Sequence, residues 1–195
     1  MIESKLISKA LFTDKTFTNL DNLLVEIGIN SYASMKQTHS DKVVQINKAG
    51  SFESDGIITS TKNLGLVVKT ADCLPILLED DINIGAVHAG WRGVKNNIVE
   101  NALRHFKSSQ LRMSVGPHAQ SCCYEVQEDV TKYLYKYIET REGKDYLNMS
   151  QSLIELSNKF GFQIEVSSIC TICDNSYNSF RENKTDKRQY GFIWQ

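Results

Sequence analysis

The segment GAVHAGWRGV, residues 85–94, marks a change from a strand to a helix. It completes the apolar run INIGAVHA, residues 82–89, which is too short for a helix and is rich in Val and Ile. After Gly93 the apolar positions recur with a helical period, at Val94, Ile98, Val99, Ala102, Leu103 and Phe106. The sequence therefore predicts a strand that leads directly into an amphipathic helix, with His88 close to the junction.

Short apolar runs on both sides of this segment are also predicted as strands. They are KVVQI (42–46), GIIT (56–59), LGLVVKT (64–70), CLPILLED (73–80), LRMSVG (111–116), FQIEVSSI (162–169) and QYGFIW (189–194). Because these strands do not alternate strictly with helices, the pattern favours an α+β fold with mixed sheets over a doubly wound parallel sheet.

Two further helices are predicted after residue 120. The first would carry Val126, Val130, Leu134 and Tyr137 on one face. The second would have Leu153, Leu156 and Phe160 facing inward, with Ser150 or Ser152 as its N-cap and Gly161 at its C-terminal end.

Composition limits the kind of protein that these elements can build. With 195 residues, of which 41% are hydrophobic, we expect a single domain over residues 1–195. The 22 Lys and Arg balance 23 Asp and Glu without a long run of either sign, which argues against a nucleic-acid binder and for small substrates. The first residues lack a secretory or membrane-spanning apolar run, so we expect a cytoplasmic protein with no membrane partner.

Three candidate metal ligands lie beside predicted strands. His39 precedes one strand, Cys73 begins another and His88 ends a third, with separations of 34 and 15 residues. Two imidazoles and a thiolate are a suitable three-ligand set for a catalytic zinc, which keeps its fourth position open. The wide spacing means that such a site would be assembled by tertiary folding. Taken singly, each residue has an ordinary alternative, a surface histidine or a small core cysteine.

The five cysteines are an odd number, which favours free thiols and metal ligation over a disulfide framework. Cys122 and Cys123 are adjacent, so we expect one of them to pack inside and neither to be needed for the metal. Cys170 and Cys173 have the spacing of a redox or zinc motif but no second such pair. Two ordinary thiols under a loop are the favoured interpretation.

Four stretches together resemble the laccase-domain family, first described as polyphenol oxidases and later as zinc-dependent purine nucleoside phosphorylases with adenosine deaminase activity. They are QTHSDKVV (37–44), TADCLPILL (70–78), VHAGWRG (87–93) and GPHAQSCCYEV (116–126), and the likeness resumes at residues 170–194. The resemblance implies a four-layer α/β/β/α sandwich with mixed sheets. It also implies that His39, Cys73 and His88 hold the metal.

The activity implied by this resemblance assigns roles to other residues. Purine nucleosides (adenosine, inosine and 5′-methylthioadenosine) and phosphate would be the partners. Arg92 is the best phosphate ligand, since its planar fork can bind two oxygens. Asp72 would be the carboxylate that moves protons in deamination, provided that the chain bends there, and His118 would protonate the leaving base or line the pocket.

The sequence departs from the family pattern in two regions. The segment before His39 is shorter than usual in the family. Near the C-terminus the paired arginines of the family appear as Arg181 and Glu182, and the later Thr-Gly-Arg as residues 185–188. Arg181 and Arg188 are therefore carried over as substrate-binding residues with less support than the three metal ligands.

Three alternatives to a zinc-dependent phosphorylase remain open at this point. Cys73 and His88 could be the nucleophile and base of a thiol hydrolase. The chain could be a non-enzymatic module with structural zinc, although only three ligands are identifiable and structural sites normally have four. A copper-dependent polyphenol oxidase with a multicopper cluster would need more imidazoles than the four histidines supply, but a single copper in the same site is an alternative to zinc.

Overall fold

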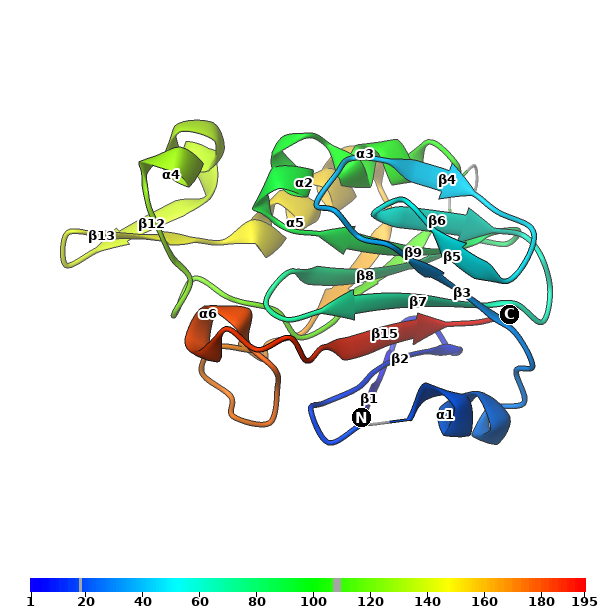
Figure 1. Ribbon diagram of the computed structural model, residues 1–195. Helices are drawn as coiled ribbons and strands as arrows, with labels where there is room; N and C mark the ends of the chain where they lie inside the picture. Colours follow the sequence, from blue (N-terminus) through cyan, green and yellow to red (C-terminus); the bar gives the residue numbers. More distant parts are fainter. Residues whose placement is uncertain (18, 107–109) are drawn as a thin grey trace.

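Two six-stranded sheets pack face to face in the computed structural model, which describes residues 1–17, 19–106 and 110–195 (Figure 1). The first sheet has the order β1 (Ile2–Glu3), β2 (Ala10–Phe12), β15 (Gln189–Ile193), β7 (Gly65–Thr70), β3 (Tyr32–Met35) and β5 (Gly50–Phe52). The second has the order β14 (Gln163–Val166), β10 (Arg112–Val115), β8 (Leu74–Glu79), β9 (Ile84–Ala89), β6 (Gly56–Thr59) and β4 (Val43–Gln45). A small antiparallel sheet contains β11 (Glu125–Val126), β13 (Lys144–Leu147) and β12 (Ile138–Arg141).

Both large sheets mix parallel and antiparallel neighbours. In the first sheet β3 runs parallel to β5 and β7, whereas the other neighbouring strands are antiparallel. In the second sheet β10 is parallel to β14 and β4 to β6, and the other pairs are antiparallel. The prediction of an α+β fold with mixed sheets is confirmed, and all eight apolar runs predicted as strands contain strands.

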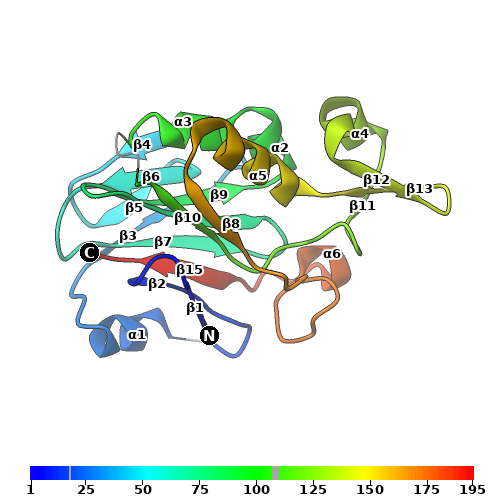
Figure 2. The same ribbon diagram turned by 180° about the vertical axis from the view of Figure 1, so that it is seen from behind.

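Helices cover the outer faces of the two sheets, which gives four layers (Figure 2). α1 (Leu20–Glu26) packs with Val67 and Phe192 on the first sheet, while α2 (Trp91–Lys95), α3 (Ile98–Leu103) and α5 (Met149–Phe160) lie over the second. The layer between the sheets includes Leu66, Leu77 and Ala86. β8 and β9 are apolar except for Glu79 and His88, because both of their faces are covered.

The predicted helices are present but differ in detail. The helix expected after Gly93 starts earlier, at Trp91, and is split in two because Asn97 adopts a left-handed conformation with φ of 62°. The helix expected to carry Val126 to Tyr137 is α4 (Glu128–Leu134), and a 3₁₀ turn (Tyr135–Tyr137) follows it. No helix in the described part of the chain is long and apolar enough to cross a membrane.

The N-cap predicted for α5 (Met149–Phe160) was wrong. Asn148, not Ser150 or Ser152, is the N-cap, and its side chain accepts a hydrogen bond from the backbone of Gln151. Phe160 is 56% exposed instead of facing inward. Gly161 does end the helix, with a φ of 73° that suits glycine.

One end of the two sheets carries the chemically interesting residues. β7 ends there at Thr70, β8 begins at Leu74, and β9 ends at Ala89, opposite Leu74 in the ladder. α6 (Phe180–Asn183) lies at the same end, because the chain returns from it to Gln189, which pairs with Thr70 (Figure 1). This end of the sheets therefore combines a turn, a strand end and two short helices, α2 and α6.

Candidate metal and substrate site

The fold brings His39, Cys73 and His88 together at this end. His39 lies in the loop between β3 and β4, Cys73 in the turn between β7 and β8, and His88 near the end of β9. Their possible ligand atoms all lie within 4.8 Å of one another. His39 Nε2 is 3.8 Å from Cys73 Sγ, and the two imidazole rings are nearly perpendicular, at 81°. Residues separated by 34 and 15 positions thus form one cluster.

Asp55 holds the two histidines in place. This fully buried carboxylate accepts a 2.7 Å hydrogen bond from Nδ1 of His88, which leaves Nε2 of that ring free to face the cluster. It also accepts hydrogen bonds from the backbone N–H groups of Thr38, His39 and Ser40, at 3.1, 3.0 and 2.8 Å. These bonds fix a loop in which His39 has a left-handed backbone, with φ of 61°. One carboxylate therefore orients one ligand directly and the other through its backbone.

The electrostatic coupling within this cluster favours a thiolate. Burial acts to raise the pKa of Cys73, but hydrogen bonds and charge from His39 and His88 lower it to about 6. Burial acts to lower the pKa of His88, but the hydrogen bond to Asp55 and the contact with Cys73 raise it to about 9. Burial also acts to raise the pKa of Asp55, but its donors hold it well below its usual range. A thiolate is the form of cysteine that binds metals.

Gly90 allows the side chains of Cys73 and His39 to approach the backbone closely. A Cβ atom at this position would lie 3.0 Å from Cys73 Sγ and 3.0 Å from Cδ2 of His39. The donor set, two imidazoles and a thiolate with a carboxylate behind one imidazole, suits a catalytic zinc ion and also a single copper ion. The residues present therefore fit one metal ion, with His39, Cys73 and His88 as its candidate ligands.

A cavity of about 470 Å³ opens onto these three residues, a volume suited to a small organic ligand. Five of its lining residues are cations: Lys69, Arg92, Arg181, Lys184 and Arg188. Three are aromatic: Trp91, Tyr124 and Phe180. Asp72 is the single carboxylate in the lining. The cavity therefore combines a positive charge, which attracts anions, with flat apolar surfaces.

Two of the arginines lie against aromatic rings. The guanidinium of Arg92 is 4.5 Å from the centre of the Trp91 ring, and that of Arg181 is 5.1 Å from the centre of Tyr124. Stacking restricts these long side chains and so reduces the entropy that they lose when an anion binds. The structure brings Arg92, Arg181 and Arg188, the three arginines selected from the sequence, to one cavity.

Asp72 also lies in the cavity lining, because the chain bends there with φ of 87°. Both of its carboxylate oxygens have protein donors. Oδ1 accepts from the hydroxyl of Thr171 at 2.7 Å, and Oδ2 accepts from the backbone N–H of Arg181 at 2.6 Å. The carboxylate therefore ties the β7–β8 turn to α6 and to the loop before it.

The structure does not bring His118 to this cavity. The side chain is fully buried, and its Nδ1 donates to the carbonyl of Gly116 at 2.8 Å. Burial lowers the pKa of His118 to about 4, so the ring is neutral at physiological pH. Its role as a proton donor to the leaving base stays a prediction from the sequence, and the geometry adds no support to it.

The expectation of free thiols is wrong for two cysteines. Cys123 and Cys173 form a disulfide, whereas Cys73, Cys122 and Cys170 are free. Cys170 and Cys173 are also not two ordinary thiols under a loop, since they lie in one cluster with Cys122 and Cys123. The spacing alone could not show this, because residues 122 and 123 meet residues 170 and 173 only through tertiary folding.

Sequence reasoning missed several residues of the site. Asp55 precedes a predicted strand, but its partner His88 is 33 positions away, so no local pattern marks it. Tyr124, Lys69 and the α6 pair Phe180 and Lys184 enter the cavity from three different segments. The one available signal was that Tyr124 stands directly after the paired cysteines of the GPHAQSCCYEV stretch.

The fold and the donor set together define a laccase-like domain with a candidate metal site. The chain belongs to the family described as "Multi-copper polyphenol oxidoreductase laccase", whose model matches residues 13–195. It is 36% identical over 158 residues to a protein of Aquifex aeolicus named purine nucleoside phosphorylase, covering 78% of this chain and 77% of that one. A protein of the same name from Clostridium acetobutylicum is 30% identical over 200 residues, covering 93% and 84% of the two chains.

Solved structures with this fold include a hypothetical protein of Bacillus licheniformis, YfiH. The TM-score is 0.85 at 24% identity, and the match covers 95% of this chain and 91% of the other. YlmD of Geobacillus stearothermophilus matches with a TM-score of 0.84 at 20% identity, over 98% and 94% of the two chains. These likenesses concern the fold.

Proposed function

We propose that this protein is a zinc-dependent purine nucleoside phosphorylase. It would convert adenosine, inosine and 5′-methylthioadenosine, with phosphate, into the free base and the ribose 1-phosphate. One observation carries the proposal: the cationic, aromatic-lined cavity opens directly onto His39, Cys73 and His88. The two relatives named purine nucleoside phosphorylase support this assignment.

The cavity residues divide into two groups that match the two substrates. Arg92, Arg181 and Arg188 offer planar forks that can each bind two phosphate oxygens. The rings of Trp91 and Tyr124 offer flat surfaces on which a purine can stack. Arg92 lies on the ring of Trp91 and Arg181 lies near the ring of Tyr124, so the phosphate-binding and base-binding residues are neighbours. Phosphate and base would therefore bind side by side.

Phosphorolysis forms one bond and breaks another at the same carbon. A phosphate oxygen bonds to C1′ of the ribose while the bond from C1′ to the purine nitrogen breaks, and the departing base takes up a proton. When bound, a zinc ion with three protein ligands supplies a Lewis acid with one position open to a substrate group. The arginines hold the phosphate against the sugar, which converts a bimolecular reaction into one between oriented groups.

Asp72 would act mainly by position. Its two oxygens already accept hydrogen bonds from Thr171 and from the backbone of Arg181, which keeps the phosphate-binding arginine at the cavity. The same carboxylate is the residue we propose for proton movement in a side activity, the deamination of adenosine by water. The zinc-deaminase signature of His-x-Glu with Pro-Cys-x-x-Cys is absent from the sequence, so this activity would have its own architecture.

A thiol hydrolase is the second candidate, and a specific contact favours it. Asp55, His88 and Cys73 follow each other as in an acid, base and nucleophile triad, with the carboxylate 2.7 Å from Nδ1 of His88. This alternative gives His39 no role, although its Nε2 lies 3.8 Å from the thiol. The three-ligand site uses all four residues, and we therefore prefer it.

Copper and structural zinc are weaker alternatives. Only two of the four histidines of the chain line the cavity, too few for a multicopper cluster, whereas one copper ion in place of zinc remains compatible with the donors. A closed structural zinc site would have a fourth protein ligand, and the group around Cys73 offers three in the described part of the chain.

Metal and product analysis test this proposal together. The protein is purified without added metal, and its metals are quantified. Adenosine and inosine are then incubated with it, with and without phosphate. We expect zinc at the three-ligand site, and free base with ribose 1-phosphate only when phosphate is present. Base release that does not depend on phosphate would overturn phosphorolysis, and full activity in metal-free protein would overturn the role of zinc.

A further inference from the structure

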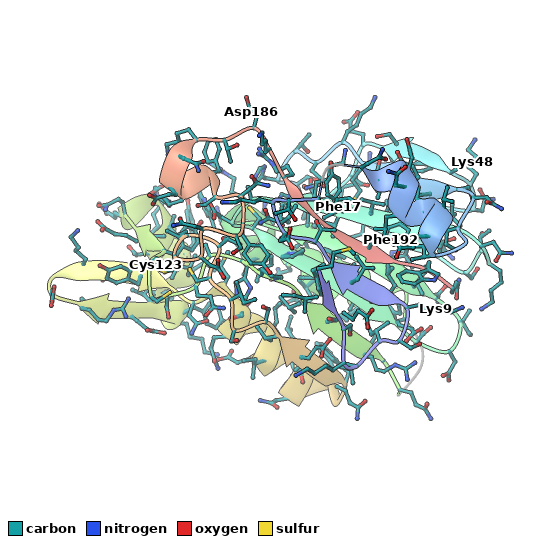
Figure 3. The ribbon with its side chains drawn as sticks, turned by 90° about the horizontal axis from the view of Figure 1, so that it is seen from below. Lys9, Phe17, Lys48, Cys123, Asp186 and Phe192 are labelled. Atoms are coloured by element: carbon teal, nitrogen blue, oxygen red, sulfur yellow. A yellow bond between two sulfur atoms is a disulfide. The ribbon has the colours of Figure 1, made fainter. Side chains whose placement is uncertain are left out.

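A second group of metal-binding side chains lies outside the site described above. Cys122, Cys123, Cys170 and Cys173 have their four sulfur atoms within 4.8 Å of one another. Cys123 lies where the chain enters the small sheet, beside the loop that leads to α6 (Figure 3). In the described residues no other group besides this one and the His39 group gathers three or more such side chains.

We propose that these four cysteines, when reduced, form a tetrahedral site for one structural Zn²⁺. Four thiolates are one of the standard donor sets of closed zinc sites, and they satisfy a four-coordinate ion without water. The site would be separate from the candidate active site, and it rests on none of the residues proposed to bind substrate.

Two tight turns bring the four sulfurs together. In the first, the N–H groups of Cys123 and Tyr124 both donate to the carbonyl of Gln120, at 3.1 and 2.9 Å. In the second, the N–H of Asp174 donates to the carbonyl of Cys170 at 3.0 Å, which closes a turn over the spacing Cys-x-x-Cys. A turn of this kind places two cysteines on the same side of the chain, as in zinc sites with this spacing.

Hydrogen bonding between the two turns supports the cluster. The backbone N–H of Gln120 donates to Sγ of Cys170 at 3.4 Å, a contact that stabilises a thiolate ligand. A backbone bond joins Thr171 to the carbonyl of His118 at 3.1 Å. The guanidinium of Arg141 donates to the carbonyl of Ser121, next to Cys122, and its charge would offset part of the negative charge of four thiolates.

The disulfide between Cys123 and Cys173 uses only two of the four sulfurs. Sγ of Cys122 lies 3.5 Å from Sγ of Cys173, and Cys170 completes the group. The disulfide therefore does not account for the position of Cys122 and Cys170, whose free thiols converge on the same point. We regard the disulfide as the oxidised form of the cluster. A dithiol reductant supplies two electrons, and with two protons the disulfide becomes two thiols. One Zn²⁺ then displaces the protons of all four thiols.

The cluster is connected to the cavity at two points. Thr171, between Cys170 and Cys173, donates its hydroxyl to Asp72 at 2.7 Å. Tyr124, directly after Cys123, lines the cavity. A zinc ion at the cysteines would therefore fix the positions of Thr171, which binds Asp72, and of Tyr124, which lines the cavity. This is a positional effect, because none of the four cysteines lines the cavity.

The first test counts metal and thiols in protein purified anaerobically from reducing cells. The double variant Cys73→Ser/His88→Ala removes the candidate catalytic site, and we expect it to retain about one zinc per chain. After denaturation with a chelator, the wild type should show all five of its cysteines as thiols. A double variant without zinc, or only three thiols in the wild type as the disulfide requires, would overturn the proposal.

The second test identifies the ligands. X-ray absorption at the zinc edge of the Cys73→Ser/His88→Ala protein should show four sulfur neighbours at about 2.3 Å and no nitrogen. In the Cys73→Ser/His88→Ala background and with cobalt in place of zinc, adding Cys122→Ser or Cys170→Ser should weaken the thiolate-to-cobalt absorption, whereas the double variant itself should keep it. Fewer than four sulfur neighbours, or equal absorption in all three variants, would contradict the assignment. The absorption measurement needs no cluster variant to fold.

These outcomes are distinct from those that test the proposed function. If the chain is not a phosphorylase, the double variant still retains its zinc. If the cysteine cluster binds no metal, the double variant is empty even when the wild type is fully active with one zinc.

Discussion

Nδ1 of His88 donates a 2.7 Å hydrogen bond to Oδ1 of Asp55, a carboxylate that no solvent reaches. The bond keeps a proton on Nδ1, and so it directs Nε2 of His88 toward Cys73 and His39. Because Asp55 also binds the backbone of the His39 loop, this one side chain organises the whole donor set.

Asp55→Asn should therefore weaken zinc binding. The amide keeps the size of the carboxylate but loses the charge and part of the acceptor capacity that orient both histidines. We expect affinity for zinc to fall by about 10- to 100-fold, as for other carboxylates behind metal-binding histidines. Competition with a chromophoric chelator measures this, and the exposed Asp41→Asn is the matched control. Equal affinities for both variants would remove Asp55 from the site.

Gly90→Ala should damage the same site by filling space. The new Cβ would lie 3.0 Å from Cys73 Sγ, closer than ordinary contacts allow. Overpacking of this kind costs about 1–3 kcal/mol, so we expect zinc affinity to fall by roughly 5- to 150-fold. Gly93→Ala, inside the helix that Gly90 precedes and against Ile98, is the control. A Gly90→Ala protein that binds zinc normally would show that no ligand approaches there.

Arg92→Ala and Arg188→Ala should mainly affect phosphate. A lost hydrogen bond between charged groups costs about 1.5–3 kcal/mol, so KM for phosphate should rise by roughly 10- to 100-fold, while KM for the nucleoside changes less. Arg104→Ala, at the end of α3 and outside the cavity lining, should leave both values unchanged. A change confined to nucleoside binding would argue against our division of the cavity.

His118 should make stability dependent on pH. Its pKa of about 4 in the folded chain lies below the ordinary value of about 6.5, so the unfolded chain binds the proton more readily. The free energy of unfolding is therefore complete above pH 6.5 and falls as the pH drops toward 4, by about 3 kcal/mol in total.

Urea unfolding of wild type and His118→Asn between pH 4 and 7.5 measures this effect. Asparagine can still donate to the carbonyl of Gly116 but does not titrate, so its stability should change less across this range. Taking the difference between the two proteins cancels the titrations that they share. Identical slopes would mean that His118 is not buried as a neutral ring.

Local patterns in the sequence predicted the strands correctly but did not predict where the helices begin and end. The run at residues 64–70 is apolar enough that burial on both faces determines its state, and β7 forms there. The split between α2 and α3 depends on one asparagine, Asn97, that adopts a left-handed backbone. The cap of α5 was predicted two or four residues too late, at Ser150 or Ser152, because asparagine and serine are both good capping residues and only the backbone geometry selects Asn148.

Some residues of the candidate site could likewise be predicted from local sequence patterns, and others could not. His39, Cys73 and His88 each stand beside a predicted strand, so their neighbours along the chain pointed to them. Asp55 and Tyr124 have no such local signal, since their partners are distant in sequence and adjacent only after folding. The four-cysteine cluster was missed for the same reason: each half of it is an unremarkable pair of residues until the two loops meet.

The most direct test of the central claim, that His39, Cys73 and His88 hold one zinc ion, compares three variants. Zinc content and the initial rate of adenosine phosphorolysis are measured for His39→Ala, Cys73→Ser and His88→Ala, with and without added zinc. Because our second proposal gives the cysteine cluster a zinc ion of its own, the zinc content of the double variant Cys73→Ser/His88→Ala is subtracted from that of each protein. We expect all three variants to lose the zinc above this reference and to lose activity together, with partial recovery of Cys73→Ser in excess zinc. Undiminished zinc in all three, with activity lost in Cys73→Ser and His88→Ala but kept in His39→Ala, would contradict the account and favour the thiol hydrolase.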